Sequence, residues 1–536
     1  MPESNTKFVV VTGSVISSLG KGTFTSSLGT LLKMAHGMKV APLKFDGYLN
    51  VDAGTLNPYR HGEVFVLDDG TECDLDLGTY ERMLNTNLTR DNYLTAGKLF
   101  HTMIIKERRG EYLGRDVQFI PHVTGEIKAF VSALGKGADV VLVEVGGTIG
   151  DLENSYFIEA MRELAHDYGR ENFCFVNLVY IIEPACAGEQ KTKAAQLGVR
   201  GLLSLGIQPD LIVCRSEHPI TEKIREKMSV FSNLPLERII NLPDRDNIYS
   251  IPLYLKELGV DRAICGILDL KTRSKTREFS RWKSFTSMTA KAGKEIIIAI
   301  TGKYTELRDS YLSILKAIEH TSPYLGVTAR LKWIDTTRID AIEKASAELE
   351  DVDGMIVPGG FGSRGTEGKI LCIRHARESG LPFLGLCYGF QLACVEFARN
   401  VCGLGDANST EIDPKAKTPL IDILPEQKEV EDLGGTMRLG SHDIEIKPGT
   451  LAYRIYGQQK ARERFRHRYE LNPGYIKTLE DKGMVFSGKA PGRDIMQIFE
   501  LPNHHFFLAT QFHPEYTSKP LEPSPVFRAF IDACSR

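Results

Sequence analysis

Residues 7–30 read KFVVVTGSVISSLGKGTFTSSLGT, and this stretch decides the fold of the N-terminal half. The apolar run at 7–12 predicts a strand buried on both faces of a parallel sheet. A turn rich in Gly and Ser follows it and ends at Lys21, after which the pattern is helical. Backbone N–H groups of such a turn and of the helix N-terminus face an anion, so the stretch predicts a phosphate-binding loop.

The loop departs from the common G-x-x-x-x-G-K-[ST] pattern. The first Gly of that pattern falls on Val15, and Gly22 stands where Ser or Thr would follow the lysine. The alternative is a tight strand-to-helix turn with a surface lysine. The strand before the loop and the helix after it favour the phosphate loop over this alternative.

Acidic residues follow further apolar segments. Asp76 lies in ECDLDLG, and Glu144 lies near the end of the predicted strand at 140–145. A carboxylate at the C-terminal end of a parallel strand, beside a phosphate loop, is where nucleotide-bound Mg²⁺ is held. Lys191 and Lys193 in GEQKTK suit a polyphosphate, although a solvated charged turn has the same composition.

Alternating strand and helix signals run through most of the chain, as is typical of α/β proteins. Further strands are predicted at 177–182, 211–215, 295–301, 354–357, 382–386 and 506–512. Segment 271–294 differs, because it carries eight Lys or Arg residues against one acid and has weak periodicity. We interpret it as a solvated linker, with a basic contact surface as the alternative. The prediction is a doubly wound α/β domain at 1–270, a linker at 271–294 and a second α/β domain at 295–536.

Composition limits the class of protein. The chain has 536 residues, with 66 Lys or Arg against 69 Asp or Glu and a net charge of −3. This balance argues against nucleic-acid binding through bulk charge. No run approaches the ~20 apolar residues that span a bilayer. The lack of such a run predicts no membrane partner. The ten scattered cysteines form no C-x-x-C pair, which predicts a reducing, cytoplasmic setting.

A second constellation lies in the C-terminal half. Cys387 in GLCYGFQ follows a short apolar strand and opens a helical pattern. A thiol on such an elbow is exposed, and the helix N-terminus favours the thiolate. His513 and Glu515 in QFHPE can share one face of an extended segment, with the histidine as base and the carboxylate as its orienting group. Taken alone, Cys387 is equally consistent with a buried core cysteine, and His513 with a structural histidine. The elbow and the H-P-E string together favour nucleophilic catalysis.

Seven strings of the first half, in chain order, resemble the synthetase domain of the CTP synthase family. They are GSVISSLGKG, VDAGTLNPYRHGEVFVLDDG, DLDLGTYER, KERRGEYLG, VQFIPHVT, VEVGGTIGD and GEQKTK. The resemblance implies that ATP phosphorylates O4 of UTP, that ammonia attacks C4 and that phosphate leaves. Phosphate is a far better leaving group than a carbonyl oxygen, and its transfer depends on charge neutralisation by metal and lysine.

The resemblance also implies site residues by motif position. ATP would be held by Ser18, Leu19, Gly20, Lys21, Gly22, Lys44 and Asp76. UTP, and CTP as a feedback inhibitor, would be held by Ser17, Asp151, Glu153, Lys191, Lys193, Gln196 and Lys227. The metal would be held by Asp76 and Glu144, and His61 would lie where ammonia arrives.

Several of these motifs depart from the family pattern. The family has Gly where Ser14 stands, Pro where Gly47 stands and His where Thr79 stands. It has K-T-K-P-T-Q-H-S where residues 191–198 read KTKAAQLG. Gly47 loosens a backbone that proline would fix, and Ala195 lacks a hydroxyl that could bond a phosphate or ribose. The charged residues survive, so we expect the reaction class to hold, and nucleotide affinity or CTP feedback to be what changes.

The C-terminal half resembles class I glutamine amidotransferases. Their mechanism implies that Cys387 attacks the glutamine amide, ammonia leaves, and water hydrolyses the glutamyl enzyme. The backbone N–H groups of Gly360, in PGGFG, and of Tyr388 would form the oxyanion hole. CTP synthases usually have Leu at the position of Tyr388, but only the backbone is needed there. Glutamine itself would be bound by Gln391, Glu411 and Arg468.

The string DLGGTMRLG at 432–440 also resembles CTP synthases, where it belongs to a lid tied to GTP activation. Its glycines fit a mobile loop, and Arg438 fits an anion contact. The alternative is an ordinary glycine-rich surface loop. A lid implies GTP as an activator, beside the substrates ATP, UTP and glutamine.

Two active sites in one chain imply an internal tunnel, because free ammonia would protonate in water. The resemblance further implies a homotetramer built through the synthetase domains, and it leaves room for filaments. Two other readings compete. One is a cobyrinate or cobyrate amidating synthase, which would not explain DLDLG, GEQKTK and DLGGTMRLG together. The other is a scaffolding homologue without turnover, to which the altered motifs give some room.

Overall fold

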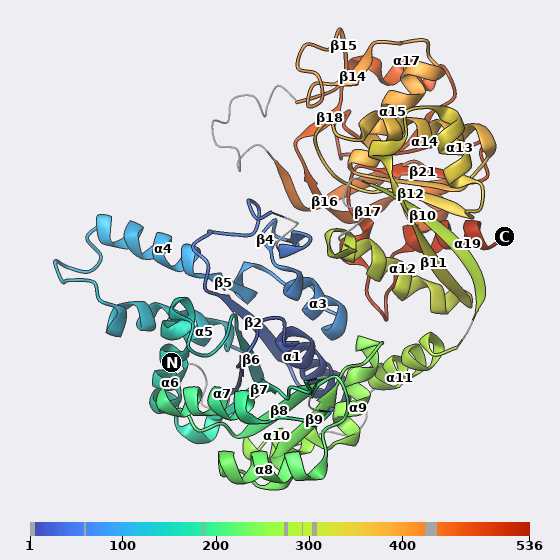
Figure 1. The fold of residues 1–536 in the computed structure, drawn as a ribbon. Helices are drawn as coiled ribbons and strands as arrows, with labels where there is room; N and C mark the ends of the chain where they lie inside the picture. Colours follow the sequence, from blue (N-terminus) through green and yellow to red (C-terminus); the bar gives the residue numbers. More distant parts are fainter. Residues whose placement is uncertain are drawn as a thin grey trace. The chain divides into compact units, whose positions relative to one another are not determined.

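The computed structural model describes residues 6–57, 61–184, 186, 188–272, 277–291, 293–302, 308–423 and 437–536. Two compact units divide the chain (Figure 1). The first comprises Met1–Thr55 and Asp76–Thr286, and the second comprises Leu56–Leu75 and Ser287–Arg536. In the parts described, no helix is long and apolar enough to cross a membrane.

The first unit is built on a seven-stranded sheet in which every neighbouring pair is parallel. In sheet order the strands are β5 (Tyr93–Thr95), β2 (Val40–Asp46), β6 (Val140–Val145), β1 (Lys7–Gly13), β7 (Phe173–Tyr180), β8 (Leu211–Ser216) and β9 (Ile239–Pro243). The chain first moves from β1 towards β2, and later from β6 past β1 towards β9. The direction of winding therefore reverses beside β1, where doubly wound sheets bind ligands.

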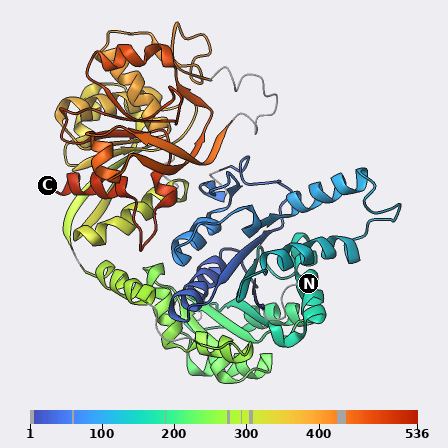
Figure 2. The same cartoon turned by 180° about the vertical axis from the view of Figure 1, so that it is seen from behind.

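Helices cover both faces of this sheet, as Figure 2 shows from behind. They are α1 (Lys21–Thr30), α3 (Leu75–Leu84), α4 (Ala96–Arg108), α5 (Thr124–Leu134), α6 (Ser155–Tyr168), α7 (Lys193–Ser204), α8 (Glu222–Ser232), α9 (Ile251–Glu257), α10 (Val260–Ile267) and α11 (Arg277–Thr289). The apolar faces of α4, α5 and α6 form one core with alternate residues of the central strands. Helix α1 packs on β1, β2 and β6 through buried residues that include Phe24 and Leu28. The predicted doubly wound fold is confirmed.

The second unit contains a nine-stranded mixed sheet. In sheet order the strands are β11 (Val327–Asp335), β10 (Lys294–Gly302), β12 (Gly354–Val357), β13 (Phe383–Leu386), β21 (Phe507–Thr510), β20 (Met496–Glu500), β19 (Val485–Lys489), β16 (Arg438–Ile446) and β17 (Lys460–His467). The pairs from β11 to β21 are parallel, and those from β21 to β17 are antiparallel. A small sheet joins β14 (Ala407–Ser409), β15 (Thr418–Ile423) and β18 (Tyr469–Leu471).

Two hydrophobic cores cover the faces of the large sheet. One includes α13 (Ile342–Leu349), α14 (Thr366–Ser379) and α15 (Tyr388–Asn400), and the other includes α12 (Leu312–Leu325), α16 (Leu451–Tyr456) and α19 (Pro525–Ser535). The short helices α17 (Ile476–Glu480) and α18 (Pro514–Thr517) complete the unit. The arrangement confirms a second α/β domain.

Part of the predicted linker is a packed helix. Phe279, Trp282 and Phe285 of α11 are buried, and the indole N–H of Trp282 donates to the Tyr249 carbonyl at 3.0 Å. Their spacing places all three rings on one helix face. The eight basic residues around them hide this apolar face in a count of charges.

Residues 56–75, which the sequence places in the first domain, belong instead to the second unit. They include a hairpin of two short antiparallel strands, β3 (Phe65–Val66) and β4 (Glu72–Cys73). No local pattern predicts this, because strand and turn signals do not reveal which core a hairpin joins.

Candidate active sites

The predicted phosphate loop follows β1 directly. Val15, Ser18 and Gly20 have left-handed backbones, with φ angles of 85°, 56° and 84°. Helix α1 begins at Lys21 without a side-chain cap and has no acidic residue in its first turn. Its first N–H groups, together with the concave left-handed loop, are therefore oriented to receive an anion.

Lys21 folds back over the loop. Its Nζ donates to the Gly147 carbonyl at 2.5 Å, and the side chain lies so close to Gly13 that a Cβ there would be 2.9 Å from Cδ of the lysine. Burial lowers the pKa of Lys21, although the charge of Glu144 acts the other way. A buried ammonium beside open N–H groups is suited to a phosphate oxygen.

A compact charge cluster lies beside the loop. Lys44 and Glu144 are register partners on β2 and β6, and Lys44 Nζ contacts Glu144 Oε1 at 2.8 Å and also Asp76 Oδ2. The Tyr80 hydroxyl donates to Glu144 Oε2. Burial raises the pKa of Glu144 even though Lys44 opposes it, and the pKa of Lys44 is raised well above its usual value because Asp76 and Glu144 outweigh the effect of burial.

The donor set fits Mg²⁺. A Cβ added to Gly22 would lie 2.4 Å from Asp76 Oδ1 and 3.5 Å from Glu144 Oε2, so both carboxylates line the first turn of α1. Among the described residues no group of three or more potential metal-ligating side chains occurs. Mg²⁺ usually takes one or two protein carboxylates and completes its octahedron with phosphate and water, so two acids beside a phosphate loop suffice.

The residues predicted for UTP fall in two groups. Lys191 pairs with Glu189, and the charge of Lys227 also acts on that carboxylate, so the two lysines gather around Glu189. Lys193 and Gln196 lie on the first turn of α7. Lys191, Lys193 and Lys227 are exposed, on the turn before α7, on α7 and on α8, whereas Gln196 is half-buried.

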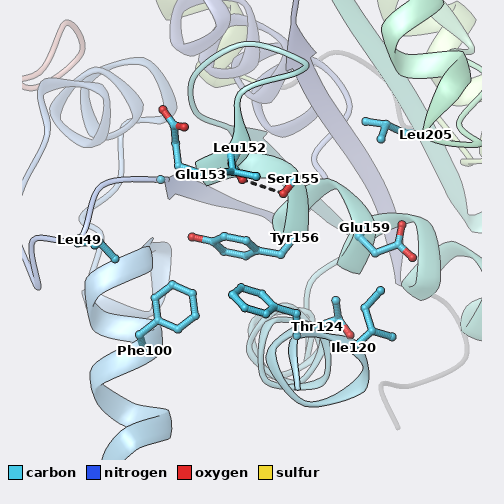
Figure 3. Close-up of a pocket in the computed structure, with 12 residues that line it drawn as sticks. Leu49, Phe100, Ile120, Thr124, Leu152, Glu153, Ser155, Tyr156, Glu159 and Leu205 are labelled. Atoms are coloured by element: carbon cyan, nitrogen blue, oxygen red, sulfur yellow. Dashed lines mark hydrogen bonds between the residues drawn. The ribbon is translucent and has the colours of Figure 1, made fainter. Parts of the chain in front are cut away.

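Asp151 and Glu153 form the other group. Asp151 Oδ2 accepts the Thr148 N–H at 2.6 Å, and Glu153 lies at the rim of a largely apolar cavity of about 750 Å³ (Figure 3). Other residues that line this cavity are Leu49, Phe100, Phe119, Ile120, Tyr156 and Leu205. A cavity with apolar walls and an acidic rim suits a flat heterocycle that carries a polar edge.

Gly47, where the family has Pro, also lines this cavity. A Cβ there would be 2.5 Å from Asn154 Oδ1 and 2.7 Å from Cγ of Glu153. Glycine therefore lets the segment with Glu153 pack directly on the end of β2.

Two further departures compensate for each other. Ser14 fills the space above Gly198 of α7, where a Cβ on residue 198 would lie 2.2 Å from Cβ of Ser14. The Ser14 hydroxyl is buried and donates to Asn177 Oδ1 at 2.9 Å. The family pattern has Gly at 14 and Ser at 198, so the large and small residues have exchanged places. The contact fixes α7 on the phosphate loop.

The predicted nucleophile lies on a strained elbow. Cys387 is the residue between β13 and α15, with φ 51° and ψ −97°, and its N–H donates to the Thr510 carbonyl at 2.7 Å. A Cβ on Gly389 would be 2.2 Å from the Val357 carbonyl oxygen, so the turn can be this sharp only with glycine there. Strain held by surrounding contacts is typical of active sites.

The base is held by its carboxylate. His513 Nδ1 bonds Glu515 Oε1 at 2.7 Å, and both side chains are buried. Burial alone would lower the pKa of His513, but the charges of Glu515 and Cys387 outweigh it and raise that pKa to about 10. The arrangement therefore stabilises an imidazolium next to the thiol.

The loop after β12 lies beside the thiol. A Cβ on Gly359 would be 2.8 Å from Cε1 of His513, and one on Gly360 would be 3.9 Å from Cδ1 of Tyr388. The Tyr388 hydroxyl donates to the Gly362 carbonyl at 2.8 Å and bonds Thr366 at 3.0 Å. The tyrosine side chain thus fastens this loop, a role that goes beyond the backbone N–H expected from the sequence.

Residues predicted to bind glutamine surround the same place. The Gly362 N–H donates to Glu411 Oε1 at 2.9 Å, and Gln391 Nε2 donates to the Tyr469 carbonyl at 2.9 Å. Arg468 is half-buried in the turn before β18. Sequence reasoning missed Gln511, whose Nε2 lies 3.7 Å from the thiol of Cys387. Its place in QFHPE, beside the base, was the available signal.

Two other predictions have different outcomes. Arg438 begins β16 and pairs with the fully buried Glu470 at 3.3 Å, so its guanidinium is engaged within the unit. The segment 424–436, which holds most of the predicted lid, lies outside the described residues. His61 is exposed, and its N–H donates to the Asn57 carbonyl at 3.1 Å.

Comparison with known proteins gives consistent matches. The CTP synthase N-terminus family matches residues 7–270, and the class-I glutamine amidotransferase family matches residues 306–533. The chain is 51% identical over 529 residues to the CTP synthase of Thermococcus gammatolerans, covering 98% of each chain. It is 49% identical over 533 residues to that of Staphylococcus carnosus, covering 99% of this chain and 98% of that one. A solved structure of the Trypanosoma brucei CTPS glutaminase domain with bound acivicin is 33% identical, with a TM-score of 0.43, covering 45% of this chain and 93% of that one.

Proposed function

Since the chain belongs to the CTP synthase family, we propose that its two groups of site residues together catalyse the amination of UTP to CTP through a 4-phosphoryl-UTP intermediate. Members of this family use ATP, UTP and glutamine as substrates, and the second unit carries the glutamine-hydrolysing half. The proposal assigns a step to each group of residues described above. The full-length family match leaves no reason to keep the cobyrinate-type alternative.

The synthetase site transfers phosphate from ATP to O4 of UTP. Residues 18–22 bind the ATP phosphates through backbone N–H groups, and Lys21 neutralises their charge. Lys44 lies between two carboxylates and stabilises the transferred phosphoryl group as charge spreads over its oxygens. Asp76 and Glu144 would hold Mg²⁺, which supplies charge neutralisation on the phosphates.

UTP is bound on the adjoining surface. Glu153 binds at the apolar cavity, which takes the pyrimidine, and Asp151 binds from the preceding turn, where its carboxylate accepts the Thr148 N–H. The triphosphate and ribose are bound by Ser17, Lys191, Lys193, Gln196 and Lys227. CTP competes for the same residues as a feedback inhibitor. Gly47, which stands where the family has Pro, shapes this cavity. We therefore expect the affinity for the nucleotide bound in this cavity to differ from that of family members with Pro.

The amidase site releases ammonia from glutamine. Cys387 attacks the amide carbon, and His513 gives a proton to the departing ammonia while Glu515 keeps the ring oriented. The N–H groups of Gly360 and Tyr388 stabilise the oxyanion. Gln391, Glu411 and Arg468 orient the glutamine; water then hydrolyses the thioester with His513 as base.

Ammonia passes through an internal tunnel to the synthetase site, and His61 lines its entry. GTP activates glutamine hydrolysis through the lid that leads into Arg438. In this scheme the pairing of Arg438 with Glu470 is a resting contact that an anionic ligand replaces.

We further propose a homotetramer assembled through the first unit and located in the cytoplasm. Helix α4 and the chain after it extend from the sheet in Figure 1. Exposed apolar side chains on this extension and near the cavity are Leu49, Ile104, Leu113, Val117, Phe119, Ile120 and Leu152. Apolar patches of this kind mark interaction surfaces. Light scattering of the purified chain measures its assembly state.

The observation that carries the proposal is the charge cluster beside the phosphate loop, in which Lys44 and Glu144 are buried and Asp76 is one-third exposed. Burying charges costs free energy, so a scaffold without turnover would gain nothing from them. The test is CTP formation from UTP, ATP and Mg²⁺ with glutamine or ammonium, with and without GTP. CTP from both donors, with GTP raising only the glutamine rate, supports the scheme, whereas glutamine hydrolysis without CTP from either donor contradicts it.

The glutamate of the triad gives a pH-dependent prediction. Glu515→Gln is expected to lower kcat/KM for glutamine by about 10²-fold. The charge of Glu515 is the main effect that raises the pKa of His513 to about 10, so its removal lowers that pKa. His513 is protonated below its pKa, and the thiolate–imidazolium pair is therefore lost at lower pH in the variant. The alkaline limb of the glutaminase pH profile should move down by about one unit or more.

Ammonium-dependent CTP formation is the control for this variant, and it should be unchanged because Glu515 has no part in phosphate transfer. An alkaline limb that stays in place would contradict the role of Glu515 in holding the imidazolium.

The exchanged pair gives a double-mutant prediction. Gly198→Ser puts two side chains in one space, and we expect the UTP KM in the ammonium reaction to rise about tenfold, because overpacking of ~1–3 kcal/mol displaces α7. Adding Ser14→Gly should restore the UTP KM. Gly266→Ala, at a helical glycine with open space around it, is the matched control. Equal damage in the single and double variants would show that the contact does not position α7.

A further inference from the structure

The hairpin of β3 and β4 is attached to β17 by two ion pairs. The Arg464 guanidinium donates to Asp68 Oδ1 at 2.7 Å and to the Val66 carbonyl at 3.1 Å. The Arg466 guanidinium donates to Glu72 Oε1 at 2.7 Å. One member of each pair is shielded from water, because the Arg464 side chain has no exposed surface and that of Glu72 is 10% exposed, whereas Asp68 and Arg466 are partly exposed. Shielded, hydrogen-bonded pairs hold geometry better than exposed ones.

The same two residues of β17 contact the amidase groups through their backbones. The Arg464 carbonyl accepts the His513 N–H at 2.8 Å, and the Arg466 carbonyl accepts the Cys387 thiol at 3.6 Å. Residues two apart on a strand present side chains to one face and carbonyls to one edge. Arg464 and Arg466 therefore bind the hairpin through their side chains. Through their backbone carbonyls they bind the base His513 and the nucleophile Cys387.

A third connection runs through an aromatic ring. Tyr516 stacks on the imidazole of His513, with ring centroids 4.8 Å apart and planes 14° apart. Its hydroxyl donates to the Val64 carbonyl at 3.3 Å, and Phe65 packs edge-on against it at 5.2 Å. The hairpin thus also supports the ring that covers the base.

The turn of the hairpin fits tightly against β16. A Cβ on Gly440 would lie 2.5 Å from the Gly70 nitrogen and 2.8 Å from the Asp68 carbonyl oxygen. The Ser441 N–H donates to that same carbonyl at 2.9 Å. Backbone packs on backbone here, so the hairpin has one register on the sheet.

We propose that the hairpin of residues 63–73 is a clamp that positions Cys387 and His513, and that Asp68 and Glu72 are positioning residues for glutamine hydrolysis. The inference rests on the proposed amidase function. The clamp touches no substrate. It fixes β17, whose carbonyls set the positions of the Cys387 thiol and the His513 imidazole relative to each other. Loss of the Glu72–Arg466 pair lets β17 shift. Even small displacements of the reacting groups in an active site reduce the rate by about 10- to 100-fold.

The test compares two ion pairs on the same strand in the full-length protein. Glu72→Gln removes the charge that holds Arg466. Asp443→Asn serves as the matched control, because it removes the partner of Arg462. Arg462 also lies on β17, and its ion pair with Asp443, at 3.0 Å, is exposed and does not reach the hairpin. The measurements are kcat and KM for glutamine hydrolysis, CTP formation with ammonium, and the melting temperature of each variant.

We expect Glu72→Gln to lower kcat for glutamine at least about tenfold with little change in KM. CTP formation with ammonium should stay at the wild-type value, and the melting temperature should fall by only a few degrees, because a single partly shielded pair is lost. Glu72→Asp keeps the carboxylate and should recover most of the rate, and Asp443→Asn should behave as the wild type.

Three outcomes would overturn the clamp. One is wild-type glutamine turnover in Glu72→Gln, and another is an equal loss with glutamine and with ammonium. The third is a loss that Asp443→Asn reproduces. Failure of the proposed amidase function is a separate result, because the wild-type protein itself would then hydrolyse no glutamine.

Discussion

Cys387→Ala is expected to abolish glutamine-dependent CTP formation, by about 10³-fold or more, and to leave the ammonium-dependent reaction at the wild-type rate. The thiol is the group on the elbow that can form the thioester, and neither Gln511 nor His513 can replace it as nucleophile. The synthetase residues lie in the other unit and keep their geometry. The measurement is CTP formation with each nitrogen donor at saturating ATP and UTP.

Cys394→Ala is the matched control, because Cys394 lies on α15, the helix that follows Cys387, and is fully buried in the core. It should keep both activities. If Cys387→Ala retained glutamine-dependent turnover, the nucleophile would have to be another residue. If both reactions fell together, the substitution would have disturbed the fold.

Glu144→Gln is expected to abolish CTP formation with both donors, again by about 10³-fold or more, while basal glutamine hydrolysis continues. The amide has the size of the carboxylate but lacks its charge. It leaves Lys44 with less opposing charge and removes one of the two predicted Mg²⁺ ligands. Initial rates over a range of Mg²⁺ concentrations separate the two effects, since loss of a ligand raises the Mg²⁺ requirement.

Asp167→Asn is the control for this variant. Asp167 is a half-exposed carboxylate on α6 that pairs with Lys128, and its neutralisation should alter neither reaction. Wild-type CTP formation by Glu144→Gln would contradict the assignment of the charge cluster to phosphoryl transfer. It would then favour a structural role for the buried carboxylate.

Eight strands are predicted from their composition and all eight occur, but other strands, such as β2 and β11, have no counterpart in the prediction. The predicted segments 140–145 and 354–357 coincide with β6 and β12. Strand β7 was predicted to begin at 177 but begins at Phe173. The cause is Asn177, a residue typical of strand ends, which here lies inside the strand and accepts the Ser14 hydroxyl. Tertiary context explains this error, because the side-chain oxygen of Asn177 accepts hydrogen bonds from Thr12 and Ser14, which lie far away in the sequence.

The residues of the candidate sites also fall into two groups, those that a local motif reveals and those that it does not. Cys387 and His513 lie in local motifs, so the sequence could point to both of them. The hydroxyl of Tyr388, the amide of Gln511 and the hairpin at Glu72 act through neighbours that are remote in sequence. Each looks ordinary in its own string, and its role depends on which elements the fold brings together.

The exchange at positions 14 and 198 restricts the routes by which such sequences can change. A chain with Gly at 14 and Ser at 198 cannot first acquire Ser14, because two side chains would then share a space that leaves 2.2 Å between their Cβ atoms. Loss of the serine at 198 must come first, and the intermediate carries glycine at both positions. That intermediate has a void and a weaker contact between α7 and the loop, which costs less than a clash. Packing therefore fixes the order of the two substitutions on any route that begins with Gly at 14 and Ser at 198.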